Sequence, residues 1–229
     1  MKLPLSKRLQ ACAAFVSKNA RVADIGCDHG YLSIYLLQQG IASSVIASDI
    51  NEGPLHCAKE NAKKYGVFQQ IEFYLSAGAE KLPHDFDTLI CAGMGADTII
   101  SILDAAPWLK EKGYTLILQC QSKAPTLRQY LFENGWQLEA ESVLKDGRFL
   151  YTVMKAHWQP NTSPIALGES YFPSVLLENG NIETQQYYHQ VVKKLRISVE
   201  GHKEHPCAAQ LQALAYLESL KTNFPPERN

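Results

Sequence analysis

Residues 21–31 combine residue types that suit the binding of a nucleotide-like cofactor. An apolar run breaks into a turn that contains Gly26 and Gly30, and an apolar helical pattern then begins. Glycine lets a backbone turn tightly and approach a ligand, and the free N–H groups of the following helix face the same place. Asp28 and His29 stand where the three-glycine dinucleotide signature has small residues, so the loop is not simply an NAD site.

Two aspartates at the ends of apolar runs supply charge to this candidate site. Asp49 closes the second run, within Ala47-Ser-Asp-Ile-Asn51. A carboxylate there can accept hydrogen bonds from both hydroxyls of a ribose, and such charge-assisted bonds are strong. Asp24, which closes the first run, could fix the loop backbone or meet a positive group of the ligand. The alternative is that both residues only cap strand ends.

A third segment, Leu89-Ile-Cys-Ala-Gly-Met-Gly-Ala-Asp97, ends an apolar run with two glycines around Met94. Gly93 and Gly95 would let the chain bend over a cofactor, and the thioether offers a polarisable surface for a flat ring. The alternative is a strand-to-helix turn with its methionine in the core.

Alternating strands and helices are needed to bring these segments together. The sequence predicts strands at 21–25, 44–50, 71–76, 87–92 and 114–120, and helices at 31–39, 53–65, 97–103 and 125–134. Two more strands, 136–144 and 149–155, flank an Asp-Gly turn, which is a strong hairpin signal. We therefore expect an α/β fold in which an open, Rossmann-like parallel sheet ends in an antiparallel hairpin. Its ligand crevice would lie at the C-terminal ends of the strands.

Helices are expected at both ends of the chain. Ser6 is the expected N-cap of a basic N-terminal helix. Residues 156–181 are rich in Pro, Gly, Asn and Ser and are expected to wrap back along the domain as a loop. Two later apolar stripes predict an antiparallel helical hairpin, with dimerisation as the competing explanation. The expected domains are residues 1–156 for the cofactor-binding sheet and 157–229 for the loop and the helical hairpin.

Composition and charge exclude several classes of protein. The 229 residues are 46% hydrophobic and 20% charged, which is enough for one core plus an appendage. No apolar run approaches the roughly 18 residues of a membrane span, and the first residues do not resemble a secretion signal, so a cytoplasmic location is expected. Six cysteines without a CxxC pair fit reduced thiols, and no histidine spacing supports zinc.

Positive residues gather in two places although the net charge is −1. Residues 1–21 carry five lysines and arginines and no acid, and a second cluster begins at Lys193. The net charge argues against nucleic-acid binding through overall charge alone, whereas each cluster could form a local basic patch. The alternative is that each is the solvated face of a helix.

Four motifs occur together in this chain: Leu5-Ser-Lys-Arg-Leu9, Ala23-Asp-Ile-Gly-Cys-Asp-His-Gly-Tyr-Leu32, Ala47-Ser-Asp-Ile-Asn-Glu-Gly-Pro-Leu55 and Ala92-Gly-Met-Gly95. Together they resemble the bacterial tRNA (adenine-N1)-methyltransferases that act on adenine 22 of the tRNA core. The resemblance covers nearly the whole chain. The Asp-His insertion and Ala-Gly-Met-Gly are its most selective parts, since many methyltransferases share the first loop.

This resemblance implies a class I enzyme with a small helical C-terminal domain. It would transfer a methyl group from S-adenosylmethionine to N1 of a tRNA adenine, release S-adenosylhomocysteine, and need no metal. We expect a monomer or weak dimer that binds tRNA and no membrane. The implied cofactor contacts are Asp24, Gly26, Cys27, Gly30, Tyr31, Asp49, Ile50, Asn51, Ala77, Gly78, Ala92 and Gly93.

The implied chemistry depends mainly on geometry. Adenine N1 has an in-plane lone pair, so its attack needs alignment and tolerance of a cationic product rather than prior deprotonation. Asp28 is the candidate to stabilise that product or to accept a hydrogen bond from the amino group. His29 could orient Asp28 or only cap the loop, and Met94 could contact the ring. Flipping the base out of the tRNA costs about a few kcal/mol. Phosphate contacts could offset this cost, and the candidates are Lys7, Arg8, Lys193, Lys194 and Arg196.

Three departures from the family's pattern leave alternatives open. Ala77 replaces the acid that commonly meets the adenine amino group, Ala96 replaces a glycine, and Cys120-Gln121 replaces Pro-Asn. A backbone carbonyl or Ser76 could substitute for the acid. The competing hypotheses are a class I methyltransferase with a small-molecule or protein substrate, an NAD(P)-dependent oxidoreductase, and a non-catalytic cofactor- or RNA-binding module.

Overall fold

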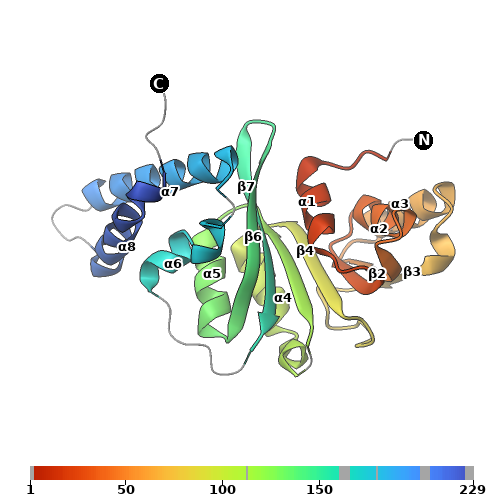
Figure 1. The fold of residues 1–229 in the computed structure, drawn as a ribbon. Coiled ribbons are helices and arrows are strands. Elements are labelled where there is room, and N and C mark those ends of the chain that lie inside the picture. The colour runs from red at the N-terminus through yellow and green to blue at the C-terminus, as the bar shows by residue number, and fades with distance from the viewer. Residues whose placement is uncertain (1–2, 112, 160–165, 179, 202–206, 225–229) are drawn as a thin grey trace.

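Seven strands form one sheet with helices on both faces (Figure 1). The computed structural model describes residues 3–111, 113–159, 166–178, 180–201 and 207–224. The strand order is β3-β2-β1-β4-β5-β7-β6; β1 to β5 are parallel, and β7 is antiparallel to β5 and β6. This confirms the predicted fold class. The strands are β1 (Ala20–Ile25), β2 (Ala42–Asp49), β3 (Ile71–Leu75), β4 (Thr88–Met94), β5 (Thr115–Cys120), β6 (Trp136–Asp146) and β7 (Phe149–Trp158).

The helices follow the predicted alternation. Ser6 caps the first one, because its Oγ accepts a hydrogen bond from the Leu9 N–H at 3.5 Å. Among the described residues, no helix is both long and apolar enough to cross a membrane. The α-helices are α1 (Lys7–Phe15), α2 (Tyr31–Gln38), α3 (Glu52–Lys64), α4 (Ala96–Asp104), α5 (Ala124–Glu133), α6 (Leu167–Tyr171), α7 (Ile182–Gly201) and α8 (Ala208–Ser219). The 3-10 turns are η1 (Phe68–Gln70), η2 (Pro107–Lys110), η3 (Ser174–Leu176) and η4 (Lys221–Asn223).

Successive buried residues of each strand point to opposite faces of the sheet. Val22 packs in the cluster that contains α1, α2 and α3, whereas Ala23 and Ile25 pack in the cluster that contains α4 and α5. Because both faces are covered, the inner strands can be apolar throughout. The carboxyl ends of β1, β2 and β4 therefore meet at one edge of a rigid scaffold, as the sequence requires for a ligand site.

The segment after β7 differs from the expected loop. The strand itself continues to Trp158, and α6 and η3 then form within the region expected to be a loop. Residues 160–165 of that region lie outside the described residues. The reason for the local order is a buried anchor, since Arg128 Nη1 donates to the carbonyl oxygens of Ser170 at 2.9 Å and Tyr171 at 3.1 Å. Pro and Gly content alone does not reveal such a tertiary contact.

Helices α7 and α8 form the predicted helical hairpin at the β6 end of the sheet (Figure 1). Tyr188 Oη donates to the Leu217 carbonyl at 2.7 Å, and Arg196 forms an ion pair with Glu218 at 2.9 Å. Most of their apolar stripes are buried against α6, η3 and Val143 of β6, whereas Leu211 is 42% exposed. Packing within one chain therefore buries most of both stripes, while dimerisation and the division into two domains stay predictions.

Candidate functional site

The loop after β1 depends on left-handed backbone conformations. Gly26, Asp28 and Gly30 have φ values of +67°, +51° and +72°. A Cβ on Gly26 would collide with the Met94 Cε, and a Cβ on Gly30 would lie 3.0 Å from the Ala58 Cβ. Gly30 is therefore required by close approach as well as by backbone angle, whereas at Gly26 the flexible Met94 side chain could move and the backbone angle is the stronger reason.

Asp49 holds this loop in place from the neighbouring strand. Its side chain is only 7% exposed, and Oδ2 accepts a hydrogen bond from the Asp28 N–H at 3.2 Å. Oδ1 accepts from the Asn51 N–H at 2.9 Å. Each carboxylate oxygen can accept more than one bond, so Asp49 can also receive the hydroxyls of a ligand.

Asp24 is a buried acid at the end of β1. It is 3% exposed, and its Oδ2 accepts a hydrogen bond from Ser33 Oγ at 2.6 Å. Burial raises the pKa of Asp24 to about 6, and the nearby charge of Asp49 adds to the shift, while the bond from Ser33 opposes it. Near neutral pH the carboxylate is therefore mostly ionised and can receive a cationic group. Burial also raises the pKa of the adjacent Cys27 thiol, which stays neutral.

Two adjoining cavities open at the carboxyl ends of β1, β2 and β4. The first, called here the apolar cavity, has a volume of about 450 Å³. The second, called the polar cavity, has a volume of about 370 Å³. Both are lined by Gly26, Asp49, Asn51 and Met94, so an elongated ligand could occupy the two together. The apolar cavity is also lined by Ile25, Ile50, Ala77, Gly78, Glu80 and Ile102, and the polar cavity by Arg8, Asp24, Cys27, Asp28, His29, Tyr31, Ala92 and Gly93.

The end of β4 is a bulge rather than a plain strand-to-helix turn. Its pairing with β5 shifts between Ala92 and Met94, and Gly93 has a φ of +84°. The fully buried Gln119 fixes this bulge, since its Oε1 accepts hydrogen bonds from the Gly93 N–H at 3.0 Å and from Arg8 Nη1 at 3.2 Å. The bend that was expected around Met94 is present, and it begins inside the strand.

The three candidate catalytic residues all line the polar cavity. The side chains of Asp28 and His29 are 71% and 50% exposed, and His29 Nε2 lies 3.6 Å from Asp28 Oδ1. The pair therefore stands where an incoming partner can reach it. Met94 lines both cavities and lies deeper, against the loop at Gly26.

The candidate RNA contacts divide into separate groups. Lys7, Lys193 and Lys194 are exposed, whereas Arg196 is paired with Glu218. Arg8 lines the polar cavity instead of facing outward with Lys7. Helices α1 and α7 lie on opposite sides of the projecting β6–β7 hairpin (Figure 1), so the two basic clusters flank this hairpin rather than merge.

Sequence reasoning missed two polar groups of the site. Glu80 lines the apolar cavity a few residues after Ala77, where the acid typical of the family is absent. Gln119 supports the bulge from within β5. No motif marks Glu80, which lies in an irregular connection. Gln119 begins the segment Gln119-Cys-Gln121, where the family has Gln-Pro-Asn, but that motif does not reveal its support of the bulge. Within the described part of the chain, no cluster of His, Cys, Asp and Glu is suited to hold a metal ion.

The match to a known family extends over most of the sheet domain. The family described as "Methyltransferase domain" matches residues 5–154. The chain belongs to this methyltransferase family. Over 156 residues it is 35% identical to the tRNA (adenine(22)-N(1))-methyltransferase of Bacillus subtilis, and the aligned part is 68% of this chain and 66% of that protein.

Solved structures resemble the methyltransferase over nearly its full length. The tRNA m1A22 methyltransferase of Bacillus subtilis superposes with a TM-score of 0.79 at 27% identity, covering 98% of this chain and 100% of that one. A Streptococcus pneumoniae protein in complex with S-adenosyl-L-methionine gives a TM-score of 0.80 at 27% identity, with coverages of 94% and 99%. The resemblance predicted from the four motifs is thus confirmed.

Proposed function

We propose that this methyltransferase transfers a methyl group from S-adenosylmethionine to N1 of adenine 22 in tRNA. The observation that carries the proposal is the pair of adjoining cavities. One has a mainly apolar lining, which suits the nucleoside end of this cofactor, and the other has charged residues, which suit its amino-acid end. The relatives support the reaction, because one is a tRNA (adenine(22)-N(1))-methyltransferase and another was solved with S-adenosyl-L-methionine.

The residues of the apolar cavity fit the nucleoside half of the cofactor. Ile50 lines this cavity and is 66% exposed, so its side chain is available to pack against the flat ring of the adenine. The Glu80 carboxylate can accept a hydrogen bond from the adenine amino group in place of the acid missing at Ala77. Asp49, which lines both cavities, can accept the ribose hydroxyls.

The polar cavity fits the amino-acid half of the cofactor. That end carries an ammonium and a carboxylate. Besides Asp49, which is assigned to the ribose, the cavity offers the buried acid Asp24 and one arginine, Arg8. Arg8 already donates to Gln119, so its guanidinium is held beside the bulge. We therefore assign Asp24 to the ammonium and Arg8 to the carboxylate. This placement favours a role for Arg8 toward the cofactor over a phosphate contact.

The exposed residues of the polar cavity would act on the target adenine of the tRNA. When bound, the cofactor supplies an electrophilic methyl group on a positively charged sulfur. The Asp28 carboxylate can accept a hydrogen bond from the adenine amino group and stabilise the positive charge that develops on the ring. His29, 3.6 Å from it, can orient that carboxylate. Met94 would present a thioether to the ring.

The tRNA would be held by the basic residues that flank the hairpin. Three exposed lysines can reach phosphates of the tRNA, namely Lys7, Lys193 and Lys194. Arg196, which is paired with Glu218, could also contact a phosphate. A cytoplasmic location fits a tRNA substrate. A monomer suffices, since the tail of one chain already lies beside its own sheet.

The decisive experiment combines purified protein, labelled S-adenosylmethionine and unmodified tRNA transcripts. The readout is the nucleoside content after digestion. We expect N1-methyladenosine in a transcript with A22 and none in the matched transcript with G22. Calorimetric titration with S-adenosylhomocysteine measures cofactor binding separately. If the protein binds the cofactor but methylates no tRNA, the assignment is wrong, and small molecules and proteins become the substrates to test.

A further inference from the structure

A third cavity lies between the sheet and the helical tail, outside the two cavities assigned to the cofactor. It has a volume of about 320 Å³ and is walled by the β5–α5 connection, β7 and α7. We propose that it receives a nucleotide of the tRNA next to the methylated adenine. This inference rests on the proposed function and adds a second point of contact with the same RNA.

The third cavity is close to the place where the target adenine would react. Gln121 N–H donates to the Met94 carbonyl at 2.8 Å, and Ala96 N–H donates to the Ser122 carbonyl at 3.2 Å. Gln121 and Ser122 both line the third cavity, while Met94 lines both cofactor cavities. One thin layer of backbone therefore separates this cavity from the methyl-transfer site.

The lining of the third cavity suits a nucleotide. The ammonium group of Lys194 can meet a phosphate, whereas that of Lys123 is paired with Asp97 at 2.7 Å and adds charge beside the cavity. The amides of Gln190 and Gln210 can bond the edge of a base. Tyr171 and Tyr187 add aromatic surface. Unpaired RNA bases are commonly recognised by aromatic packing together with hydrogen bonds to their edges. The volume is that of a small ligand site, which suits one nucleotide and not a duplex.

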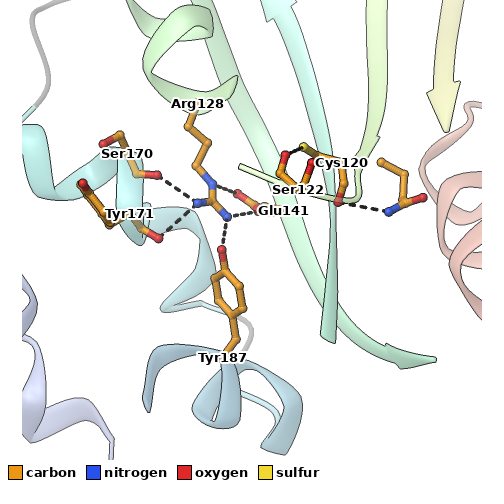
Figure 2. Close-up of polar contacts among 8 residues, drawn as sticks. Cys120, Ser122, Arg128, Glu141, Ser170, Tyr171 and Tyr187 are labelled. Atoms are coloured by element: carbon orange, nitrogen blue, oxygen red, sulfur yellow. Dashed lines mark hydrogen bonds and ion pairs between the residues drawn. The ribbon is translucent and has the colours of Figure 1, made fainter. Parts of the chain in front are cut away.

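The wall of this cavity is held rigidly before any ligand arrives. Figure 2 shows Arg128 donating to the Tyr187 hydroxyl and to the backbone of Tyr171 while it is paired with Glu141. Both tyrosines line the third cavity. A polar group in the same wall also lacks a partner, because the buried Thr152 Oγ1 has no hydrogen bond among the described residues. Buried hydroxyls are normally hydrogen-bonded to protein or ordered water, so this atom adds a polar spot to the wall and is not itself evidence of a ligand.

Photocrosslinking tests where this cavity meets the RNA. The photoreactive residue p-benzoylphenylalanine replaces Gln190, which is exposed and lines the cavity. In a matched control it replaces Lys64, which is exposed on α3, remote from the tail. With the A22 transcript and S-adenosylhomocysteine, we expect the Gln190 variant to crosslink within about two nucleotides of adenine 22. Crosslinks only to distant nucleotides, or none above the Lys64 background, would overturn the inference.

A charge deletion provides an independent readout. Lys194→Ala should raise the KM for tRNA about tenfold while the affinity for S-adenosylhomocysteine stays within twofold. Lys64→Ala makes the same change of charge elsewhere and should leave KM within twofold. Equal KM values for the two variants would argue against the inference. Failure of the proposed function looks different, because the unaltered protein would then produce no N1-methyladenosine at all.

Discussion

Cofactor binding should weaken sharply as the pH falls below about 6. Burial raises the pKa of Asp24 from 3.8 to about 6 in the free protein, so its folded state holds a proton more tightly than its unfolded state. The stability that this group contributes is complete below pH 4 and is lost as the pH rises through 6, which amounts to about 3 kcal/mol. The ammonium of the cofactor requires the ionised form of Asp24 instead.

The magnitude follows from the fraction of Asp24 that is ionised. With a pKa of about 6, roughly nine tenths of the carboxylate is ionised at pH 7 and roughly one tenth at pH 5. The apparent Kd for S-adenosylhomocysteine should therefore rise about tenfold between pH 7 and pH 5. Calorimetric titration at constant ionic strength measures this slope. The α-amino group of the ligand remains protonated throughout this interval.

Two variants isolate the group responsible. Asp24→Asn removes the titrating carboxylate, so it should bind more weakly at pH 7 and show almost no slope between pH 7 and pH 5. His29 lines the same cavity, so His29→Asn, which leaves Asp24 intact, is the matched control and should retain the tenfold slope. The assignment of Asp24 to the ammonium is refuted if the unaltered protein binds equally at both pH values, or if the His29→Asn variant loses the slope while Asp24→Asn keeps it.

Three further predictions concern the other groups of the site and its support. Glu80→Gln should weaken S-adenosylhomocysteine binding about fivefold in calorimetry, because it removes one charged acceptor. An unchanged Kd would mean that a backbone carbonyl, and not Glu80, accepts the hydrogen bond from the adenine amino group of the cofactor. Arg8→Ala should raise the Kd for S-adenosylhomocysteine at least tenfold, whereas Lys7→Ala should change only the KM for tRNA. The reverse pattern would mean that Arg8 contacts the RNA and not the cofactor. Arg128→Met should cost about 3–5 kcal/mol in urea unfolding because it leaves the buried Glu141 without its 2.6 Å partner, and adding Glu141→Leu should recover most of that loss. No recovery would mean that the other bonds of the arginine carry the stability.

Local patterns were sufficient to predict the sheet and its turns. Short apolar runs, period-3.6 spacing, the Ser6 cap and the Asp-Gly turn each act within a few residues, so the sequence contains the signal for these elements. The helices α6 and η3 were missed because Arg128 stabilises them from a distant part of the chain. The same limit explains Gln119 and Glu80, since their roles depend on which cavity or bulge lies beside them.

Asp28 shows why the loop departs from a glycine-rich pattern. Its φ of +51° is a conformation that glycine adopts freely and that costs another residue roughly 1 kcal/mol or more. Its N–H is bonded to Asp49, a bond that glycine would make equally well, so the backbone does not require an aspartate. What glycine lacks is the carboxylate, which is 71% exposed at the opening of the polar cavity. We therefore infer that this side chain contacts a ligand rather than another part of the protein. In the proposed reaction that ligand is the target adenine of the tRNA.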